Sequence, residues 1–348
     1  MAALMGDGRI GLISQQIPEC RPGMVLVEVY ASLVSPGTEL AGWRGLTAQR
    51  ENPQSGAVPQ PFGYSNTGVV IALGSGVKSL KVGDRVACIG AGYAQHADYV
   101  VVPHNLCVLL PSSVTMAQGT YGMLAATGLH AVRRAEAEIG ENTAVAGLGL
   151  VGQLTARLFQ IAGHFVIGWD TVPLRCKIAK RWGIDATADP RKADLVAETR
   201  AFTGGMGLDA AVVAFGGDAN AAMKNIEASM KISPDAHPMG RVIMVGNPQF
   251  QYTGSMTNID IRRASRTGPG YHDPVWEKGA DYPSVFMRWT TRTNLALCLR
   301  LIAEGRLNVD VLTTHTVPLQ DVEKRIAAML GKPDDILGVV FEMRRERR

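Results

Sequence analysis

The chain has 348 residues, of which 46% are hydrophobic and 19% are charged. This composition excludes a largely disordered protein, and the length suits two domains better than a single core. The formal net charge is only +4, and the Lys and Arg residues are dispersed, which argues against a nucleic-acid partner. The one basic cluster is predicted to be a solvated tail, and it consists of Arg344, Arg345, Arg347 and Arg348.

Membrane and export signals are not recognisable in the sequence. Uninterrupted apolar runs stay well short of the ~20 residues that a membrane helix needs. The first ten residues have neither the basic start nor the apolar core of a signal peptide. The five cysteines are far apart and form no CxxC pair, which favours reduced thiols over disulfides or a structural metal site. We therefore expect a cytoplasmic protein with no membrane partner.

Two kinds of sequence follow each other along the chain. Up to about residue 118, Val-rich runs broken by Gly, Pro and Asp predict an antiparallel, barrel-like β-domain, with strands in MVLVEVYASLV, TGVVIAL, DRVACIG and ADYVVVP. From about residue 119, helical spacing alternates with apolar strands, in TAVAG, FVIGWD, DAAVVAFGG and RVIMVGN. This alternation predicts an α/β domain in which helices cover a parallel sheet. After residue 286, the helix NLALCLRLIAEG leads to a last strand, LGVVFEM.

Three glycines between the strand TAVAG and the next helix form the pattern G-x-G-x-x-G: Gly147, Gly149 and Gly152. In a dinucleotide-binding turn, the first permits a tight turn, the second lets backbone approach a pyrophosphate, and the third lets the helix pack closely. The helix start then presents unpaired N–H groups to phosphate. Asp170 ends the next strand and can bind both hydroxyls of a ribose, which favours NAD over NADP, although Arg175 weakens this preference. The alternative is a purely structural glycine turn.

Several further segments resemble the medium-chain dehydrogenase/reductase superfamily, which includes the zinc alcohol dehydrogenases. They are VSPGTE, PFGYSNTGVV, KVGDRV, YGMLAATGLHAV, RVIMVGNP and THTVPLQDVEKRIAAML. The resemblance implies a GroES-like β-barrel catalytic domain at about 1–118 and 287–348, a doubly wound Rossmann domain at 119–286, and an active site in the cleft between them. It also implies a homodimer, with RVIMVGNPQFQYT as the edge strand of a shared sheet. Further cofactor contacts are expected at Thr127, Leu150, Val151, Phe215, Val245, Gly246 and Asn247.

The chain departs from the zinc-dependent members at the metal site. Pro36, Tyr64 and Met123 stand where those members carry zinc ligands, and zinc requires nitrogen, thiolate or carboxylate donors. The four-cysteine structural zinc lobe is also missing. We therefore expect a zinc-free member. The remaining His and Cys residues of the first domain have no ligand spacing and are expected to be barrel residues: Cys88, His96, His104 and Cys107.

Without a metal, hydrogen-bond donors must stabilise the substrate oxygen during hydride transfer. Tyr64 takes the place of a ligand and is a candidate donor, and Thr38 matches the relay hydroxyl of the family. The alternative for Tyr64 is an aromatic ring that fills the vacated metal cavity. The family counterpart of Glu39 is mostly structural, and structural roles are also expected for Ser35 and Ser65.

A long polar and aromatic segment, residues 262–294, is the second unusual feature. Loops of this length in a compact domain are usually functional or disordered, and the density of aromatic residues argues against disorder. On the family fold the segment leaves the Rossmann sheet near the nicotinamide. His272 and Asp273 are candidates for proton transfer, and the substrate-binding candidates are Trp276, Arg288 and Trp289. A dimer contact is the alternative for each of these residues.

These features predict an NAD(H)-dependent, zinc-independent oxidoreductase that interconverts a secondary alcohol and a ketone. The polar loop suggests a small-molecule substrate with a hydroxylated ring, such as a sugar or cyclitol. One alternative is an NADPH-dependent quinone or enoyl reductase that acts on a C=C bond, although Asp170 counts against NADPH. The other alternative is a nucleotide-binding protein without turnover.

Overall fold

The computed structural model of the chain describes residues 1–39, 45, 48, 51–52, 58–251, 258–264 and 266–344. The chain divides into two compact units, one formed by Met1–Met123 with Pro269–Arg348 and the other by Leu124–Gly268. Residues 269–286, which the sequence prediction assigned to the Rossmann domain, thus fall in the first unit. Among the described residues, no helix has the length and apolar character needed to cross a membrane.

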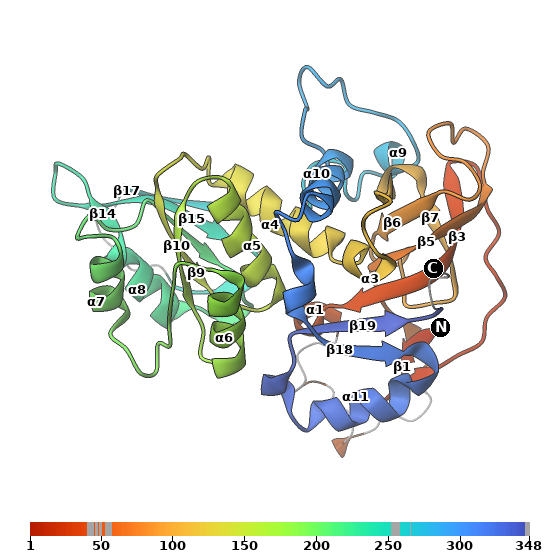
Figure 1. Cartoon of the computed structure of the whole chain (residues 1–348), viewed down its shortest axis with the longest axis horizontal. Helices are drawn as coiled ribbons and strands as arrows, with labels where there is room; N and C mark the ends of the chain where they lie inside the picture. The colour runs from red at the N-terminus through yellow and green to blue at the C-terminus, as the bar shows by residue number, and fades with distance from the viewer. Residues whose placement is uncertain are drawn as a thin grey trace. The chain divides into compact units, whose positions relative to one another are not determined.

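The first unit is built on a seven-stranded sheet in which β18 and β19 are parallel and the other pairs are antiparallel (Figure 1). The long strand β3 pairs with β5, β7 and β19, and its side chains alternate between buried and partly exposed over most of its length. This alternation is typical of a sheet with one face on a core. The strands are β3 (Met24–Val34), β5 (Ser65–Leu73), β6 (Arg85–Ile89), β7 (Tyr99–Pro103), β8 (Cys107–Leu109), β18 (Thr313–Pro318) and β19 (Gly338–Glu342).

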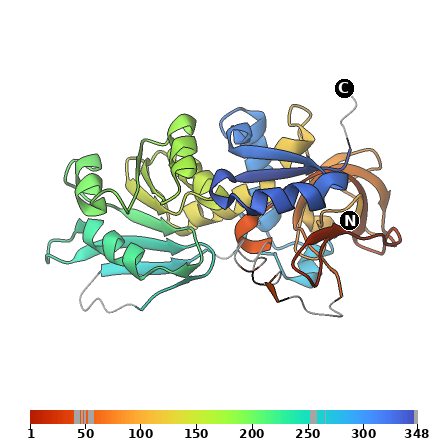
Figure 2. The same ribbon diagram turned by 90° about the horizontal axis from the view of Figure 1, so that it is seen from below.

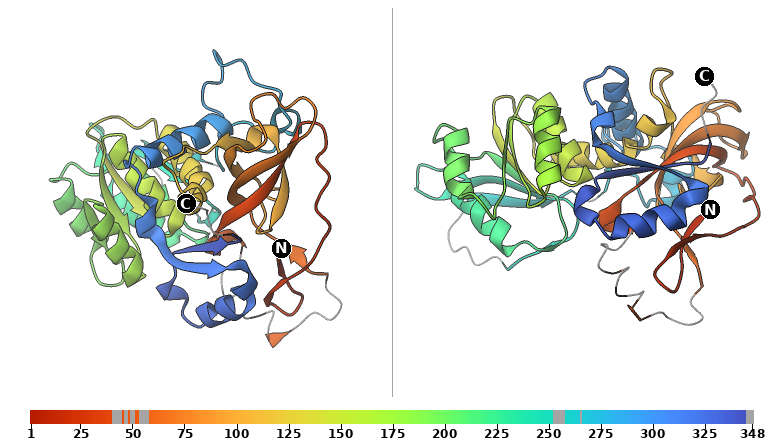
Figure 3. Two further views of the ribbon diagram at one scale, coloured as in Figure 1. Left: turned by 45° about the vertical axis from the view of Figure 1, so that its right-hand side comes forward. Right: turned by 60° about the horizontal axis from the view of Figure 1, so that its bottom comes forward.

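A three-stranded antiparallel sheet of order β2-β1-β4 completes the strands of this unit, with β1 at Ala2–Leu4, β2 at Ile10–Leu12 and β4 at Gln60–Pro61. Helix α11 (Val322–Leu330) runs alongside β2 and β18 (Figure 3). Apolar side chains of these elements form one core cluster that also takes in Phe62 and Phe341. Strands from the end of the chain, β18 and β19, thus extend the sheet of the β-domain that the sequence predicted for its start.

Short helices connect the strands of the first unit, and one longer helix, α10, begins at a capping box formed by Thr290 and Thr293. Asn105 holds the short α9 and the loop after it in place, because its Nδ2 donates to the carbonyl oxygens of Trp276 and Ala280. The helices are α1 (Pro36–Glu39), α3 (Met116–Gly119), α9 (Pro274–Glu277), α10 (Thr291–Ala303), and the 3₁₀ turns η1 (His104–Leu106), η2 (Val309–Leu312), η3 (Leu319–Asp321) and η4 (Pro333–Asp335).

The second unit is a doubly wound α/β domain, as the sequence predicted. Its main sheet has the order β11-β10-β9-β12-β15, with β14 and β17 both beside β15, and β14 is its antiparallel member. Helices α5 and α6 lie on one side of the sheet and α7 and α8 on the other (Figures 1 and 2). The strands are β9 (Asn142–Ala146), β10 (Phe165–Trp169), β11 (Ala186–Ala188), β12 (Ala210–Val213), β14 (Lys231–Ile232), β15 (Pro238–Met244) and β17 (Asn258–Arg263). The helices are α4 (Gly122–Arg134), α5 (Leu150–Ile161), α6 (Pro173–Trp182), α7 (Leu195–Phe202) and α8 (Asn220–Ser229), and a small parallel pair joins β13 (Gly217–Asp218) to β16 (Pro248–Gln249).

The edge of the main sheet is not where the sequence placed it. The predicted edge segment, RVIMVGNPQFQYT, contains most of β15, which is paired with β12 and β14 on one side and with β17 on the other. The prediction was wrong because β17 adds one more parallel strand after it. Residues 252–257, which include the end of the predicted segment, lie outside the described residues.

At the end of the chain, Arg344 is tied to the first unit. Its guanidinium pairs with Glu28 and lies 5.2 Å from the centre of the Tyr99 ring. Arg345, Arg347 and Arg348, the rest of the predicted basic tail, lie outside the described residues.

Candidate functional site

The glycine turn of the second unit has the geometry that the sequence predicted. Gly147 has φ +92°, in the left-handed region that favours glycine. Gly149 is the N-cap of α5. A Cβ at Gly152 would lie 1.7 Å from the carbonyl oxygen of Gly147, so only glycine lets the helix start so close to the strand end. Each glycine therefore does what a dinucleotide-binding turn requires of it.

This turn fits the phosphates of a dinucleotide. A Cβ built at Gly149 would meet nothing within 4 Å, so the space above this backbone is open. In the described part of the chain, the N–H groups of Leu150 and Val151 have no hydrogen-bond acceptor, because they begin α5 and no side chain caps them. Unpaired N–H groups at the positive end of a helix dipole attract anions.

Asp170 follows β10 beside the turn and is only 6% exposed. Its Oδ2 accepts the N–H of Leu148 at 2.7 Å, and its Oδ1 accepts the N–H of Val172 at 2.8 Å. Arg175 lies 3.4 Å from the same Oδ2. Oδ2 thus accepts from both Leu148 and Arg175, while Oδ1 can accept a second hydrogen bond, so Asp170 fixes the turn and keeps acceptor capacity for a ribose at Oδ1.

The other predicted cofactor contacts lie at the ends of neighbouring parallel strands. Phe215 follows β12 and is next to Gly147, where a Cβ would come within 3.1 Å of the Phe215 ring. Gly246, with φ +95°, and Asn247 are exposed and follow β15, after the buried Val245. In α/β sheets, ligands bind outside the carboxyl ends of the strands. Thr127 is partly buried in α4.

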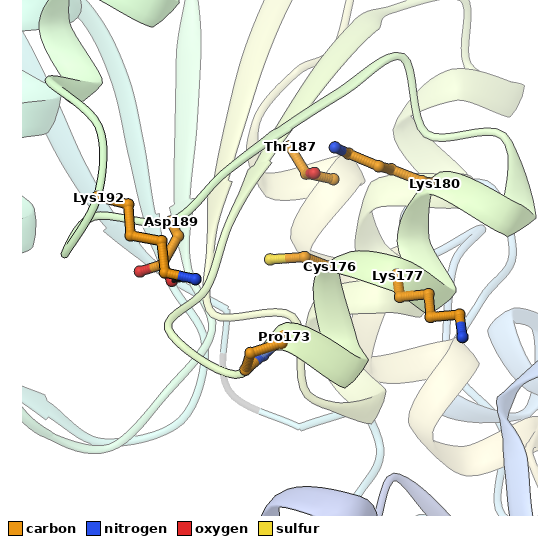
Figure 4. A pocket seen from close by; sticks show the side chains of 7 residues that line it. All are labelled: Pro173, Cys176, Lys177, Lys180, Thr187, Asp189 and Lys192. Carbon is orange, nitrogen blue, oxygen red and sulfur yellow. Dashed lines mark ion pairs between the residues drawn. The ribbon is translucent and has the colours of Figure 1, made fainter.

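A hollow lined by three lysines lies next to Asp170, and the sequence analysis missed it. Its walls come from the start of α6 and the end of β11 (Figure 4). Cys176 connects the hollow to Asp170, because its Sγ lies 3.4 Å from the carbonyl oxygen of Asp170. The residues that line the hollow are Pro173, Cys176, Lys177, Lys180, Thr187, Asp189 and Lys192. The signal in the sequence was the basic run after Asp170, of which only Arg175 was considered.

In the first unit, the structure brings Tyr64 and Thr38 together. Tyr64 precedes β5, Thr38 is exposed on α1, and the Tyr64 phenol shares hydrogen bonds with the hydroxyl groups of Ser35 and Thr38. Burial raises the pKa of the Tyr64 phenol well above its ordinary value, and the negative charge of Glu39 raises it further. The phenol is therefore protonated at neutral pH and can act as a hydrogen-bond donor.

Behind this hydroxyl cluster lies a buried pair that sequence reasoning treated as structural. Glu39 Oε2 accepts the backbone N–H of Ser35 at 2.6 Å, and Glu39 Oε1 lies 3.4 Å from Nε2 of His96. The two side chains are 3% and 0% exposed. Tyr271 contributes from the loop before α9, and its hydroxyl accepts the N–H of Ala91 at 2.9 Å. No motif in the sequence links these segments, so only the fold reveals them.

The resemblance placed Pro36, Tyr64 and Met123 at the three zinc positions of zinc-dependent relatives, and the structure buries Met123. None of these three side chains is one of the usual zinc ligands, so they do not fit a catalytic zinc. In the part of the chain that the structure describes, no group of three or more His, Cys, Asp or Glu side chains is arranged to hold a metal ion. Independence from zinc stays a prediction.

The two proton-transfer candidates in the long segment have different surroundings. Asp273 caps α9, because its Oδ1 accepts the N–H groups of Val275 and Trp276, and its Oδ2 accepts the Tyr282 hydroxyl at 2.7 Å. The hydrogen bond from the Tyr282 hydroxyl is the main reason that the pKa of Asp273 is lowered. His272 is exposed, has φ +69°, and its ring lies 4.2 Å from that of Tyr271. The contacts of Asp273 support a structural role, and proton transfer by either residue stays a prediction.

The three predicted substrate-binding residues are not equally accessible. Trp276 is 1% exposed, its ring stacks on Tyr282 with centroids 6.0 Å apart, and a Cβ at Gly270 would overlap it. This burial supports a core role for Trp276. Arg288 is exposed and lies 4.5 Å above the partly buried ring of Trp289. Ligand binding by Arg288 and Trp289 stays a prediction.

Replacing Asp273 distinguishes its two possible roles. We expect Asp273→Ala to lower the melting temperature, because α9 loses its N-cap and Tyr282 loses its acceptor. We expect turnover per folded molecule to be unchanged. The measurement is calorimetry together with an assay on the same sample. A hundredfold loss of turnover at an unchanged melting temperature would instead assign Asp273 to proton transfer.

Comparison with known families and proteins agrees with this geometry. The alcohol dehydrogenase GroES-like domain family matches residues 21–112, and the zinc-binding dehydrogenase family matches residues 151–271. The NADP-dependent isopropanol dehydrogenase of Entamoeba histolytica is 26% identical, with 98% of this chain and 95% of that protein covered. A probable D-xylulose reductase A of Arthroderma otae is 26% identical, with 76% of each protein covered.

Solved structures share the fold over nearly the whole chain. An oxidoreductase/dehydrogenase of unknown specificity from Escherichia coli has a TM-score of 0.78 at 20% identity, with 99% of each chain covered. The 2R,3R-butanediol dehydrogenase of Bacillus subtilis has a TM-score of 0.73, also at 20% identity and with 99% of each chain covered. From the two family matches, the curated relatives and the shared fold, we conclude that this chain belongs to the medium-chain dehydrogenase/reductase superfamily and is an oxidoreductase.

Proposed function

We propose that the protein is an NAD(H)-dependent, zinc-independent enzyme that interconverts a secondary alcohol and a ketone on a small molecule such as a sugar or cyclitol. The observation that carries this proposal is the cluster of Ser35, Thr38 and Tyr64 hydroxyls at a position where zinc relatives hold the metal. The relatives named as isopropanol dehydrogenase and D-xylulose reductase support a substrate with an alcohol or ketone group.

In this proposal the Tyr64 phenol does the work of the missing metal. A bound nicotinamide supplies the hydride for ketone reduction and accepts it in the reverse direction. In reduction, Tyr64 donates a hydrogen bond to the carbonyl oxygen and gives up its proton as the alkoxide forms. The hydroxyl of Thr38, which is exposed and bonded to the phenol, then passes a proton from solvent to the Tyr64 phenolate. The high pKa of Tyr64 keeps the phenol protonated, so it is a donor throughout the neutral range.

We propose NAD as the preferred cofactor because a carboxylate at Asp170 accepts ribose hydroxyls and repels a 2′-phosphate. One observation favours NADP instead. Arg175 and the lysines of the hollow lie close to Asp170, and the buried Nε of Arg175 has no hydrogen-bond partner among the described residues. With NADPH, reduction of an activated C=C bond is the second candidate function.

Binding titrations with the two reduced cofactors test this preference. We expect the wild-type chain to bind NADH about tenfold more tightly than NADPH, measured by fluorescence. Asp170→Asn keeps an acceptor for the N–H of Leu148 but removes the negative charge, and we expect it to abolish the preference. Lys180→Ala in the hollow, with Lys224→Ala on α8 as its control, should leave NADH binding unchanged. Tighter binding of NADPH that depends on Lys180 would move the assignment to the C=C reductases.

We also propose a homodimer in the cytoplasm. Strand β17 lies at the edge of the main sheet, with exposed Ile261, and offers an edge to a second copy. All five cysteines are free, which suits a reducing compartment. Sedimentation of the purified chain tests the dimer, and a monomer at micromolar concentration would contradict it.

A further inference from the structure

We propose that Glu39 and His96 are positioning residues that act through Tyr64, and that their buried pair fixes the segment of Ser35 and the backbone that carries the Tyr64 phenol. This inference rests on the proposed function of Tyr64. Neither residue is proposed to touch the substrate, because both are buried behind the hydroxyl cluster.

Glu39 is placed to act on the phenol in two ways. Its Oε2 accepts the N–H of Ser35 at 2.6 Å, which fixes the residue whose hydroxyl bonds to the phenol. Its charge also disfavours a phenolate at Tyr64, since two negative charges in a buried site repel each other. Among the described residues, the two ionisable groups with the largest electrostatic effect on the phenol are Glu39 on α1 and Tyr271 in the loop before α9.

His96 fixes the other end of this carboxylate. Its Nε2 lies 3.4 Å from Glu39 Oε1, and its Nδ1 lies 2.7 Å from the hydroxyl oxygen of Ser32. The rings of Phe62 and Phe341 pack edge-on against the imidazole, at centroid distances of 4.8 and 5.0 Å. The hydrogen bond and the two aromatic rings fix the His96 imidazole, so the Glu39 carboxylate stays directed at Ser35.

The backbone of His96 also sets the position of Tyr64. A Cβ at Gly63 would lie 2.5 Å from the backbone N of His96, and Gly63 has φ +117°. The N–H of His96 donates to the carbonyl oxygen of Phe62 at 3.0 Å, and the N–H of Gly90 donates to that of Tyr64 at 2.9 Å. The turn that carries His96 therefore holds both the Glu39 carboxylate and the backbone at Tyr64.

Stability alone is a poor reason for such a pair. Burying two ionisable side chains costs solvation free energy, and apolar residues of similar size often stabilise a protein at least as well. Glu39 Oε1 and His96 Nε2 make no hydrogen bond to any described residue, so each side chain has one further hydrogen bond, to Ser35 for Glu39 and to Ser32 for His96, to offset this cost. Its position directly behind Ser35 and Tyr64 points to an electrostatic effect on the phenol.

The test follows the ionisation of Tyr64 itself. The full chain is labelled with 3-fluorotyrosine, whose phenol ionises at lower pH than tyrosine, and is titrated by ¹⁹F NMR. The signal of Tyr64 among the 8 tyrosines is assigned with Tyr64→Phe. We expect Glu39→Gln to lower the titration midpoint of Tyr64 by about one pH unit or more, because it removes a charge without changing shape. Glu28→Gln, which alters a carboxylate of β3 that pairs with Arg344, is the control and should not move the Tyr64 signal.

His96→Gln provides the second variant and keeps the inference testable if Glu39→Gln does not fold. Gln retains an N–H donor, so we expect a folded protein. It lacks the ring against which Phe62 and Phe341 pack, so Glu39 is fixed less firmly and Tyr64 should titrate at lower pH than in wild type. An unchanged midpoint of Tyr64 in every folded variant would overturn the inference. Failure of the proposed function would look different: Tyr64→Phe would keep full activity, whatever the titration of Tyr64 shows.

Discussion

Gly149→Ala is expected to fold like the wild-type chain and yet to bind NADH at least about tenfold more weakly. The added methyl group meets no protein atom within 4 Å, so the free energy of unfolding should hardly change. The same methyl occupies the open space above the start of α5, where the pyrophosphate approaches the backbone. Fluorescence titration with NADH and urea unfolding measure the two effects separately.

Gly152→Ala is the matched variant, in which we expect the main effect on stability and not on the space above the turn. Its methyl group would lie 1.7 Å from the carbonyl oxygen of Gly147, and backbone cannot yield as a flexible side chain does. We expect the free energy of unfolding to fall by about 3 kcal/mol or more, as in other overpacked sites. Wild-type affinity for NADH in Gly149→Ala would show that the dinucleotide does not bind at this turn.

Tyr64→Phe is expected to lower kcat/KM for a secondary alcohol by about 10²–10³ and to leave the Kd for NADH unchanged. The phenol oxygen is the group proposed to bind the substrate oxygen, and the ring that fills the site is retained. Alcohols and polyols are screened with the wild-type chain first, and the best substrate is then used for both proteins.

Tyr121→Phe is the control for the loss of a buried phenol. The Tyr121 hydroxyl bonds to Thr313 at 2.7 Å, and burial raises the pKa of Tyr121 as it does that of Tyr64. We expect full activity in this variant. Equal activity losses in Tyr64→Phe and Tyr121→Phe would mean that Tyr64 only fills the site, which was the alternative reading of its sequence position.

The raised pKa values of these two phenols also predict how stability depends on pH. Folding favours the protonated phenol, so this contribution is fully present below the ordinary pKa of 10.0 and is lost as pH rises beyond it. The melting temperature should therefore fall at alkaline pH, and it should fall less steeply in Tyr64→Phe and in Tyr121→Phe. Calorimetry between neutral pH and pH of about 11 measures this slope.

The sequence was sufficient for the fold and for the turn because both depend on local patterns. Alternating strands and helices specify the parallel sheet of the second unit, and the G-x-G-x-x-G spacing locates a turn that only glycine can make. The same patterns did not reveal β17, a partly exposed strand with several charged residues, and this is why β15 was taken for the edge.

The surroundings of Tyr64 could not be read from the sequence because they join distant segments. Glu39 and His96 are far apart along the chain, and the sheet of the first unit brings them within 3.4 Å. For Asp273 and Trp276, the residue types suggested proton transfer and substrate binding, and both roles stay predictions. The fold engages Asp273 as the cap of α9 and buries Trp276. The reactive residue types in the long loop indicated that these positions matter, but they did not indicate the role of each residue.

The central claim is that this oxidoreductase works without zinc, and one measurement tests it directly. The metal content of the purified chain and its rate of NADH formation with the best alcohol substrate are determined on the same EDTA-treated sample. The hydroxyl cluster at Tyr64 predicts full activity at far less than one zinc per chain. Activity that disappears with EDTA and returns with stoichiometric zinc would contradict the account, because it would place a metal where Pro36, Tyr64 and Met123 offer it no ligands.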